Sequence, residues 1–456
     1  MRRTLIRAIP LLIIGWAAIM LLALRFGFLN GFFYSAANFS VQGVDFFSLP
    51  KAFLNLLRQQ SMYDSWGGIP YGPYHTWFLA HPAFGLFVGF WFSFFAPWAS
   101  YWLFVLFSLA LLAWSARLIA AQTADPLRQR ASYLLILCSF PTFWLLYTGN
   151  IQAVAVLGFA LILTALFSLT YRTDTSSVKA ANIYLLAGLL ISFFSKPFAL
   201  LYLPALLINR ATRRTAIIGL VIYFVVSALF IFVPVLNPEA IKPAELFHLA
   251  LNPQFVKDHL NIYANNFVVN KYMKDNSIHW FNLVAQSDHY WNHVDIFSLA
   301  AFTNNLIGRI LPGIIFKLPL YLTLLLSLLL IFIKQEKKRS EILIILVMAL
   351  TLTFFLSYNT VWEYQYTLFL PAVALLPLLY ERKIFFRRWI PWLLAISGFL
   401  YLPTLYFLLR ARAIDGLVMT LIRLDKVVPA LLLFLILIIL TAAEMVKAFS
   451  SRSNPS

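Results

Sequence analysis

The chain has 456 residues, of which 62% are hydrophobic and only 11% are charged, and its formal net charge is +18. A water-soluble globule of this length needs a far larger charged surface, so the composition excludes a soluble protein and predicts an all-α polytopic membrane protein. Lys and Arg gather in short clusters between apolar runs, where they orient membrane spans, so the positive charge does not indicate nucleic-acid binding.

Thirteen apolar runs are candidates to cross a hydrocarbon layer, which takes about 20 helical residues. They lie at 8–29, 78–97, 99–119, 131–148, 150–170, 181–195, 197–208, 215–236, 311–333, 341–357, 366–380, 389–408 and 427–447. The first run has no evident small-residue cleavage site after it, so we expect a retained span and not a signal peptide.

Short basic clusters predict which loops are cytoplasmic. They lie at the N-terminus and at 117–130, 172–179, 210–214, 334–339 and 382–388. If both 78–97 and 99–119 crossed the membrane, there would be one crossing too many to place all of these basic clusters in the cytoplasm. Because 78–97 follows a turn-rich segment, begins near His81 and Pro82, and is rich in Trp and Phe, we expect it to be a juxtamembrane or re-entrant helix.

The predicted architecture is a single transmembrane domain over 1–456 with about twelve spans and both termini in the cytoplasm. Residues 30–98 form a long first extracytoplasmic loop with juxtamembrane helices, and 237–310 form a second large one. We expect the cell inner (plasma) membrane as the location and membrane lipids as neighbours.

Asp45 is a carboxylate about fifteen residues beyond the first span, flanked by Val44 and by Phe46 and Phe47. A carboxylate that is partly desolvated at the membrane interface can accept the proton of an attacking hydroxyl. The alternative is a helix N-cap, because a helical pattern follows at 49–57.

Four cations could bind an anionic group on the outer face. Lys196 stands between two apolar runs, where a cation is expected to have an anionic partner such as a lipid phosphate, although a lysine that snorkels to the interface is the alternative. Arg410, Arg412 and Arg423 lie in a segment predicted to be outside, against the usual charge bias. Arginine forks suit a phosphate, and ordinary lipid headgroup contacts are the alternative.

Amides, a carboxylate and an aromatic ring occur in two turns on the same predicted face: Asn150 and Gln152, then Trp362 and Glu363. Such groups commonly hold sugars. The histidines between 248 and 293 match no ligand spacing, and Cys138 is single, so we expect neither a metal nor a cofactor. No nucleotide-binding motif is present, so energy must come from an activated lipid or an ion gradient.

Several short motifs occur in a recognisable order. They are Asp45-Phe46, Met62-Tyr63-Asp64, Tyr71-Gly72-Pro73-Tyr74 followed by His75, Gly149-Asn150-Ile151-Gln152, Lys196-Pro197, and Ser357 to Gln365. Over roughly residues 10–375 this order resembles the integral-membrane GT-C glycosyltransferases, most closely the family 87 mannosyltransferases that use polyprenyl-phosphate-mannose.

The resemblance implies a GT-C fold and an inverting transfer of a hexose, with mannose expected, from a polyprenyl-phosphate donor to a lipid-linked or cell-envelope acceptor. Asp45 would be the general base on the extracytoplasmic side. Lys196 and the three arginines would bind the donor phosphate. Tyr63, Tyr71, His75, Asn150, Gln152, Trp362 and Glu363 would contact the substrates.

The chain departs from the family pattern at three places. The two amides of the Asn150 turn are exchanged, Gly72 replaces the first proline of a Pro-Pro pair, and Tyr364 and Gln365 stand where the family has late histidines. Two other functions stay open: a transporter or flippase of lipid-linked saccharides that breaks no bond, and a membrane scaffold without enzymatic activity.

Overall fold

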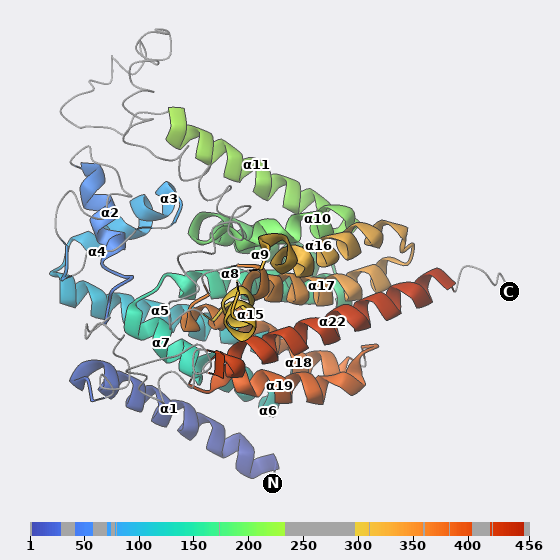
Figure 1. Ribbon diagram of the computed structural model, residues 1–456, viewed down its shortest axis with the longest axis horizontal. Helices are drawn as coiled ribbons and strands as arrows, with labels where there is room; N and C mark the ends of the chain where they lie inside the picture. Colours follow the sequence, from blue (N-terminus) through green and yellow to red (C-terminus); the bar gives the residue numbers. More distant parts are fainter. Residues whose placement is uncertain are drawn as a thin grey trace, which may run out of the picture.

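The computed structural model describes residues 2–28, 42–57, 71–73, 78, 80–172, 174–232, 297–309, 311–358, 361–382, 384–403, 420–421 and 423–450. This part of the chain is helical, without a β-strand, and its helices pack into one bundle around a continuous apolar core (Figure 1). The chain is therefore a multi-pass helical membrane protein, as the composition predicted.

The helices follow one another along the whole described chain. In order they are α1 (Arg2–Phe26), α2 (Ser48–Leu57), α3 (Pro82–Phe84), the π-helix η2 (Gly85–Gly89), α4 (Phe90–Ser93), α5 (Pro97–Ala120), α6 (Pro126–Leu137), α7 (Phe140–Thr148), α8 (Gln152–Tyr171), α9 (Thr175–Ser195), the 3₁₀ helix η3 (Pro197–Tyr202), α10 (Leu203–Ile208), α11 (Arg210–Phe232), α15 (Leu299–Ile307), α16 (Gly313–Leu329), η4 (Leu330–Phe332), α17 (Glu336–Ser357), η5 (Glu363–Phe369), α18 (Leu370–Glu381), η6 (Arg387–Trp389), α19 (Ile390–Tyr401) and α22 (Leu424–Ser450).

Within the described residues, 7 helices are long and apolar enough to cross a membrane on their own, or up to 8 if α6 and α7 form one bent span. The seven are α1, α5, α8, α9, α16 with η4, α17 and α22. The sequence predicted about twelve spans. Part of the difference is that several predicted runs form short or broken helices, such as the apolar pair over Pro197–Ile208.

The run predicted at 131–148 is one of these broken elements. Helices α6 and α7 meet at a 48° bend. The hydroxyl of Ser139 accepts a hydrogen bond from the backbone N–H of Thr142 at 3.1 Å and so caps a new helix, and Pro141 follows in the first turn of that helix.

Helices α8 and α17 lie at the centre of the bundle and are buried along most of their length. Two glycines let α8 approach α9 closely. A Cβ on Gly158 would lie 2.5 Å from the hydroxyl of Ser192, and a Cβ on Gly188 would lie 2.7 Å from the carbonyl oxygen of Gly158. Small residues at helix contacts are the usual means of tight packing in membranes.

The run predicted at 78–97 contains α3, η2 and α4, of 3, 5 and 4 residues. End to end these pieces reach roughly 18 Å, which is well short of a hydrocarbon core of about 30 Å. They lie beside α2 at one end of the bundle (Figure 1). A Cβ on Gly89 would lie 2.6 Å from the carbonyl oxygen of Leu49, so η2 packs directly on the backbone of α2.

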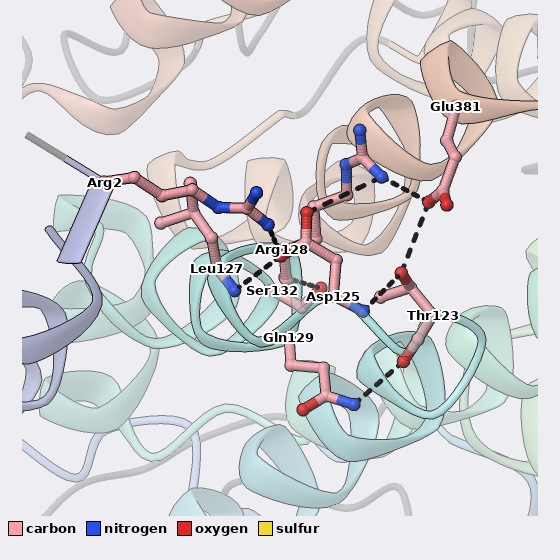
Figure 2. Close-up of polar contacts among 8 residues, drawn as sticks. All are labelled: Arg2, Thr123, Asp125, Leu127, Arg128, Gln129, Ser132 and Glu381. Atoms are coloured by element: carbon pink, nitrogen blue, oxygen red, sulfur yellow. Dashed lines mark hydrogen bonds and ion pairs between the residues drawn. The ribbon is translucent and has the colours of Figure 1, made fainter.

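Basic loops far apart in sequence meet at the opposite end of the bundle, here called the basic end. Asp125 caps α6 and pairs with Arg2 of α1 at 2.7 Å and with Arg128 at 3.7 Å (Figure 2). Arg128 also pairs with Glu381 at the end of α18, and Thr123 donates to that carboxylate at 3.3 Å. The predicted cytoplasmic loops around these residues therefore share one end.

Candidate active site

The polar turns predicted to face outward come together at the end of the bundle opposite the basic end. The turn at 42–47 is held against the C-terminus of α7 by its backbone. The N–H of Gly43 donates to the carbonyl oxygen of Tyr147 at 2.8 Å, and the N–H of Asp45 donates to that of Thr148 at 2.9 Å. Asp45 is thus fixed to a helix far from it in sequence.

Two buried phenylalanines anchor this turn. Phe46 and Phe47 are both 0% exposed, and the Phe46 ring centroid lies 5.0 Å from that of Phe104 on α5. Asp45 itself is half-buried. Helix α2 begins at Ser48, so Asp45 is not in the N-cap position.

Asn150 joins Asp45 to Lys196. Its Nδ2 donates to Oδ2 of Asp45 at 2.8 Å, while its Oδ1 accepts from Nζ of Lys196 at 3.1 Å and from the N–H of Gln152 at 2.9 Å. The opposite amide orientation would place oxygen against a carboxylate, so these partners fix the amide. The turn depends on Gly149, whose φ of 68° ends α7 in the left-handed region.

The surroundings shift the pKa of both charged groups. Burial raises the pKa of Asp45 above its usual value, and hydrogen bonds from Asn150, Thr148 and Tyr364 together with the charge of Lys196 partly offset that increase. Burial lowers the pKa of Lys196 to about 8, against the opposing effect of Asp45. The site thus holds a more basic carboxylate beside a cation that loses its proton more easily.

Tyr364, at the start of η5, completes this arrangement. Its side chain lowers the pKa of the Asp45 carboxyl, and Nζ of Lys196 lies 5.4 Å from the centre of its ring. A ring face at this distance attracts a cation. In the sequence, Tyr364 stands where the resembled family has a late histidine, but it was not predicted as a site residue.

Glu363 takes a different partner, although it precedes Tyr364. Its Oε1 lies 3.2 Å from Nζ of Lys426 on α22, and both side chains are almost fully buried, at 1% and 0% exposure. Lys426 also donates to carbonyl oxygens at the end of α19, those of Phe399 and Leu400 at 3.2 Å and that of Leu402. Glu363 therefore belongs to a buried ion pair. In sequence it lies next to the group formed by Asp45, Asn150, Lys196 and Tyr364, here called the Asp45 cluster, because it directly precedes Tyr364.

Gln152 and Trp362 flank the cluster. Gln152 is 1% exposed, and its Oε1 has no hydrogen-bond partner within the described structure. Trp362 is half-buried, and its backbone N–H donates to Oε1 of Gln365 at 3.1 Å, which caps η5.

Tyr71 and Arg423 are both buried. The hydroxyl of Tyr71 lies 2.8 Å from the carbonyl oxygens of both Phe92 and Phe95, so it supports α4. Arg423 is 0% exposed and lies three residues before Lys426. The other predicted site residues, Tyr63, His75, Arg410 and Arg412, lie outside the described residues, as do 237–296 of the second predicted loop.

The described residues contain no group of three or more His, Cys, Asp or Glu side chains suited to a metal ion. Comparison of the chain with known protein families, with curated proteins and with solved structures finds no match.

Proposed function

We propose that the chain is a membrane glycosyltransferase of the GT-C type, which transfers a hexose, with mannose expected, from a polyprenyl-phosphate donor to a lipid-linked or envelope acceptor. The observation that carries this proposal is the Asp45–Asn150–Lys196 bridge. The bridge brings a carboxylate, an amide and a cation from three separate segments into contact, and Asp45 and Lys196 are half-buried.

The reaction needs both charges. The acceptor hydroxyl attacks the anomeric carbon, its proton passes to Asp45, and the bond from that carbon to the phosphate oxygen breaks with its electron pair on the departing polyprenyl phosphate. Lys196 stabilises the charge that develops on this phosphate, where preorganised cations contribute most. Asn150 holds the carboxylate and the ammonium apart, so that each meets a different end of the reacting centre. Attack opposite the leaving group inverts the anomeric configuration.

The proposed topology has twelve crossings. They are the seven long helices, the bent α6–α7 pair, Pro197–Ile208, α11, η5 with α18, and α19. We assign the basic end to the cytoplasm because arginines and lysines cluster there. The Asp45 cluster then faces the extracytoplasmic side, where a polyprenyl-phosphate sugar would meet its acceptor.

The test is Asp45→Asn in purified protein reconstituted with polyprenyl-phosphate mannose that carries a labelled sugar, and with extracted envelope lipids as acceptors. We expect loss of transfer by at least roughly 100-fold, the usual contribution of a general base. Asp174→Asn is the matched control, because Asp174 caps α9 and asparagine caps equally well. Transfer by Asp45→Asn at the wild-type rate would remove Asp45 as the base.

The buried Glu363–Lys426 pair favours a second candidate, a flippase of lipid-linked saccharides, because charges inside a bundle often mark a transport path. The wild-type protein in lipid vesicles with the same labelled donor distinguishes the transferase from the flippase. Movement of the labelled lipid to the other leaflet with its sugar bond intact, and without product, would identify a flippase.

A further inference from the structure

The first five residues of α11 carry three arginines at the basic end of the bundle. Arg210, Arg213 and Arg214 line a shallow hollow of about 490 Å³ together with Ile217 and Ile218. This feature, here called the α11 hollow, has no part in the Asp45 cluster.

The charge of the hollow is largely uncompensated. Arg210 lies 3.6 Å from Glu336, but the two side chains are 76% and 66% exposed, so the pair contributes little. The guanidinium of Arg213 donates to the carbonyl oxygens of Leu207 at 2.7 Å and Ile208 at 3.4 Å. These bonds fix the position of the guanidinium, but carbonyl groups are neutral and do not cancel its charge. Within the described structure, Glu336 is the one carboxylate paired with these arginines.

An exposed apolar strip continues from the hollow along α11. Ile217 is 46% exposed and Ile218 40%, and Val221, Phe224 and Val225 are 53%, 59% and 53% exposed. Their spacing places them on one face of the helix. The surface therefore changes from a cluster of cations to a continuous apolar strip. An amphiphile would match this order if its headgroup lay at the basic end and its apolar tail along the strip.

We propose that the α11 hollow binds one anionic phospholipid. The arginines hold its phosphodiester through forked hydrogen bonds, and an acyl chain lies along the strip from Ile217 to Val225. Anionic lipids are abundant in the cytoplasmic leaflet, which is the leaflet that the basic end would face. The proposal does not depend on the sugar-transfer reaction.

The test is a lipid titration of the purified full-length protein in detergent, with bound lipid counted by native mass spectrometry. We expect one phosphatidylglycerol to bind well before phosphatidylcholine does. In Arg210→Gln with Arg214→Gln, phosphatidylglycerol affinity should fall about ten- to thirtyfold. Arg213 is kept because it caps α10. If the double variant does not remain monodisperse, Arg214→Gln alone gives the same test with a smaller fall.

The matched control is Arg387→Gln with Arg388→Gln, which removes the same charge from η6 and should leave affinity unchanged. An equal fall in both variants, or equal binding of both lipids by the wild type, would overturn the proposal. Phe224→Ala tests the strip and should weaken phosphatidylglycerol binding without changing that of glycerol 3-phosphate. If glycerol 3-phosphate displaced phosphatidylglycerol when both were present at the same concentration, the hollow would bind a phosphate group without an acyl chain. That result would also overturn the proposal.

Discussion

Glu363 and Lys426 form an ion pair of 3.2 Å from which water is almost fully excluded. The pair connects the start of η5 to α22, and the further bonds of Lys426 extend the connection to the end of α19. Because Tyr364 follows Glu363 directly, the pair also helps to position the residue that lowers the pKa of Asp45. The buried charges thus support the cluster without entering it.

Lys426→Met should lower the free energy of unfolding by roughly 3–5 kcal/mol, because it leaves the carboxylate of Glu363 buried without its cation. Adding Glu363→Gln should restore part of the loss. The measurement is thermal unfolding of the purified protein. Lys447→Met, which breaks a pair on the same helix whose lysine is 73% exposed, is the control and should cost no more than about 1 kcal/mol. Equal losses in the two lysine variants would contradict the assigned role.

Transfer should show a bell-shaped dependence on pH. The proposed reaction needs Asp45 deprotonated, so its rate should rise with pH through the raised pKa of that carboxyl. It needs Lys196 protonated, so the rate falls as pH passes about 8. In Lys196→Arg the decrease above pH 8 should disappear, because guanidinium keeps its proton. An unchanged alkaline decrease in this variant would exclude Lys196 as its source.

Tyr364→Phe should move the acidic limb of the same profile to higher pH, because the hydroxyl of Tyr364 normally lowers the pKa of Asp45 and the variant lacks it. The ring remains, so the fold and the contact with Lys196 should persist. Tyr202→Phe, which removes the hydroxyl bonded to Thr351 in the core, is the matched control and should leave the limb in place. An unchanged or lower limb in Tyr364→Phe would refute the assigned effect of this hydroxyl on Asp45.

Gly149→Ala should reduce the free energy of unfolding by at least about 2 kcal/mol and abolish transfer, because its Cβ would lie 2.5 Å from Cβ of Phe46 at a positive φ. Gly308→Ala is the control, since that glycine has a φ of 71° and open space around it. This control should cost about 1 kcal/mol, the conformational term alone. Thermal unfolding of both variants and a transfer assay decide the point.

The apolar pattern predicted the class of the protein and the approximate position of most helices. It did not predict breaks inside apolar runs, because the bend at Ser139 depends on a local cap that hydropathy does not register. The basic clusters predicted which loops share an end, and the network around Asp125 confirms this for three of them.

The sequence placed Asp45, Asn150, Lys196 and Glu363 on one face, and the structure brings the first three into contact. Glu363 pairs with Lys426 because adjacent residues in η5 point in different directions, which linear order does not reveal. Tyr364 was not predicted as a site residue, although it stands where the resembled family has a late histidine, because its role depends on two groups from distant turns.

The backbone of the Asp45 turn is bonded to the end of α7, at Tyr147 and Thr148. Asp45, the proposed base, is therefore positioned by the helical bundle. Among proteins with the proposed activity, the chain after this turn can then change in length and composition as the acceptor changes, while the proposed reacting groups keep their places. Divergence in acceptor choice would then require no redesign of the chemistry.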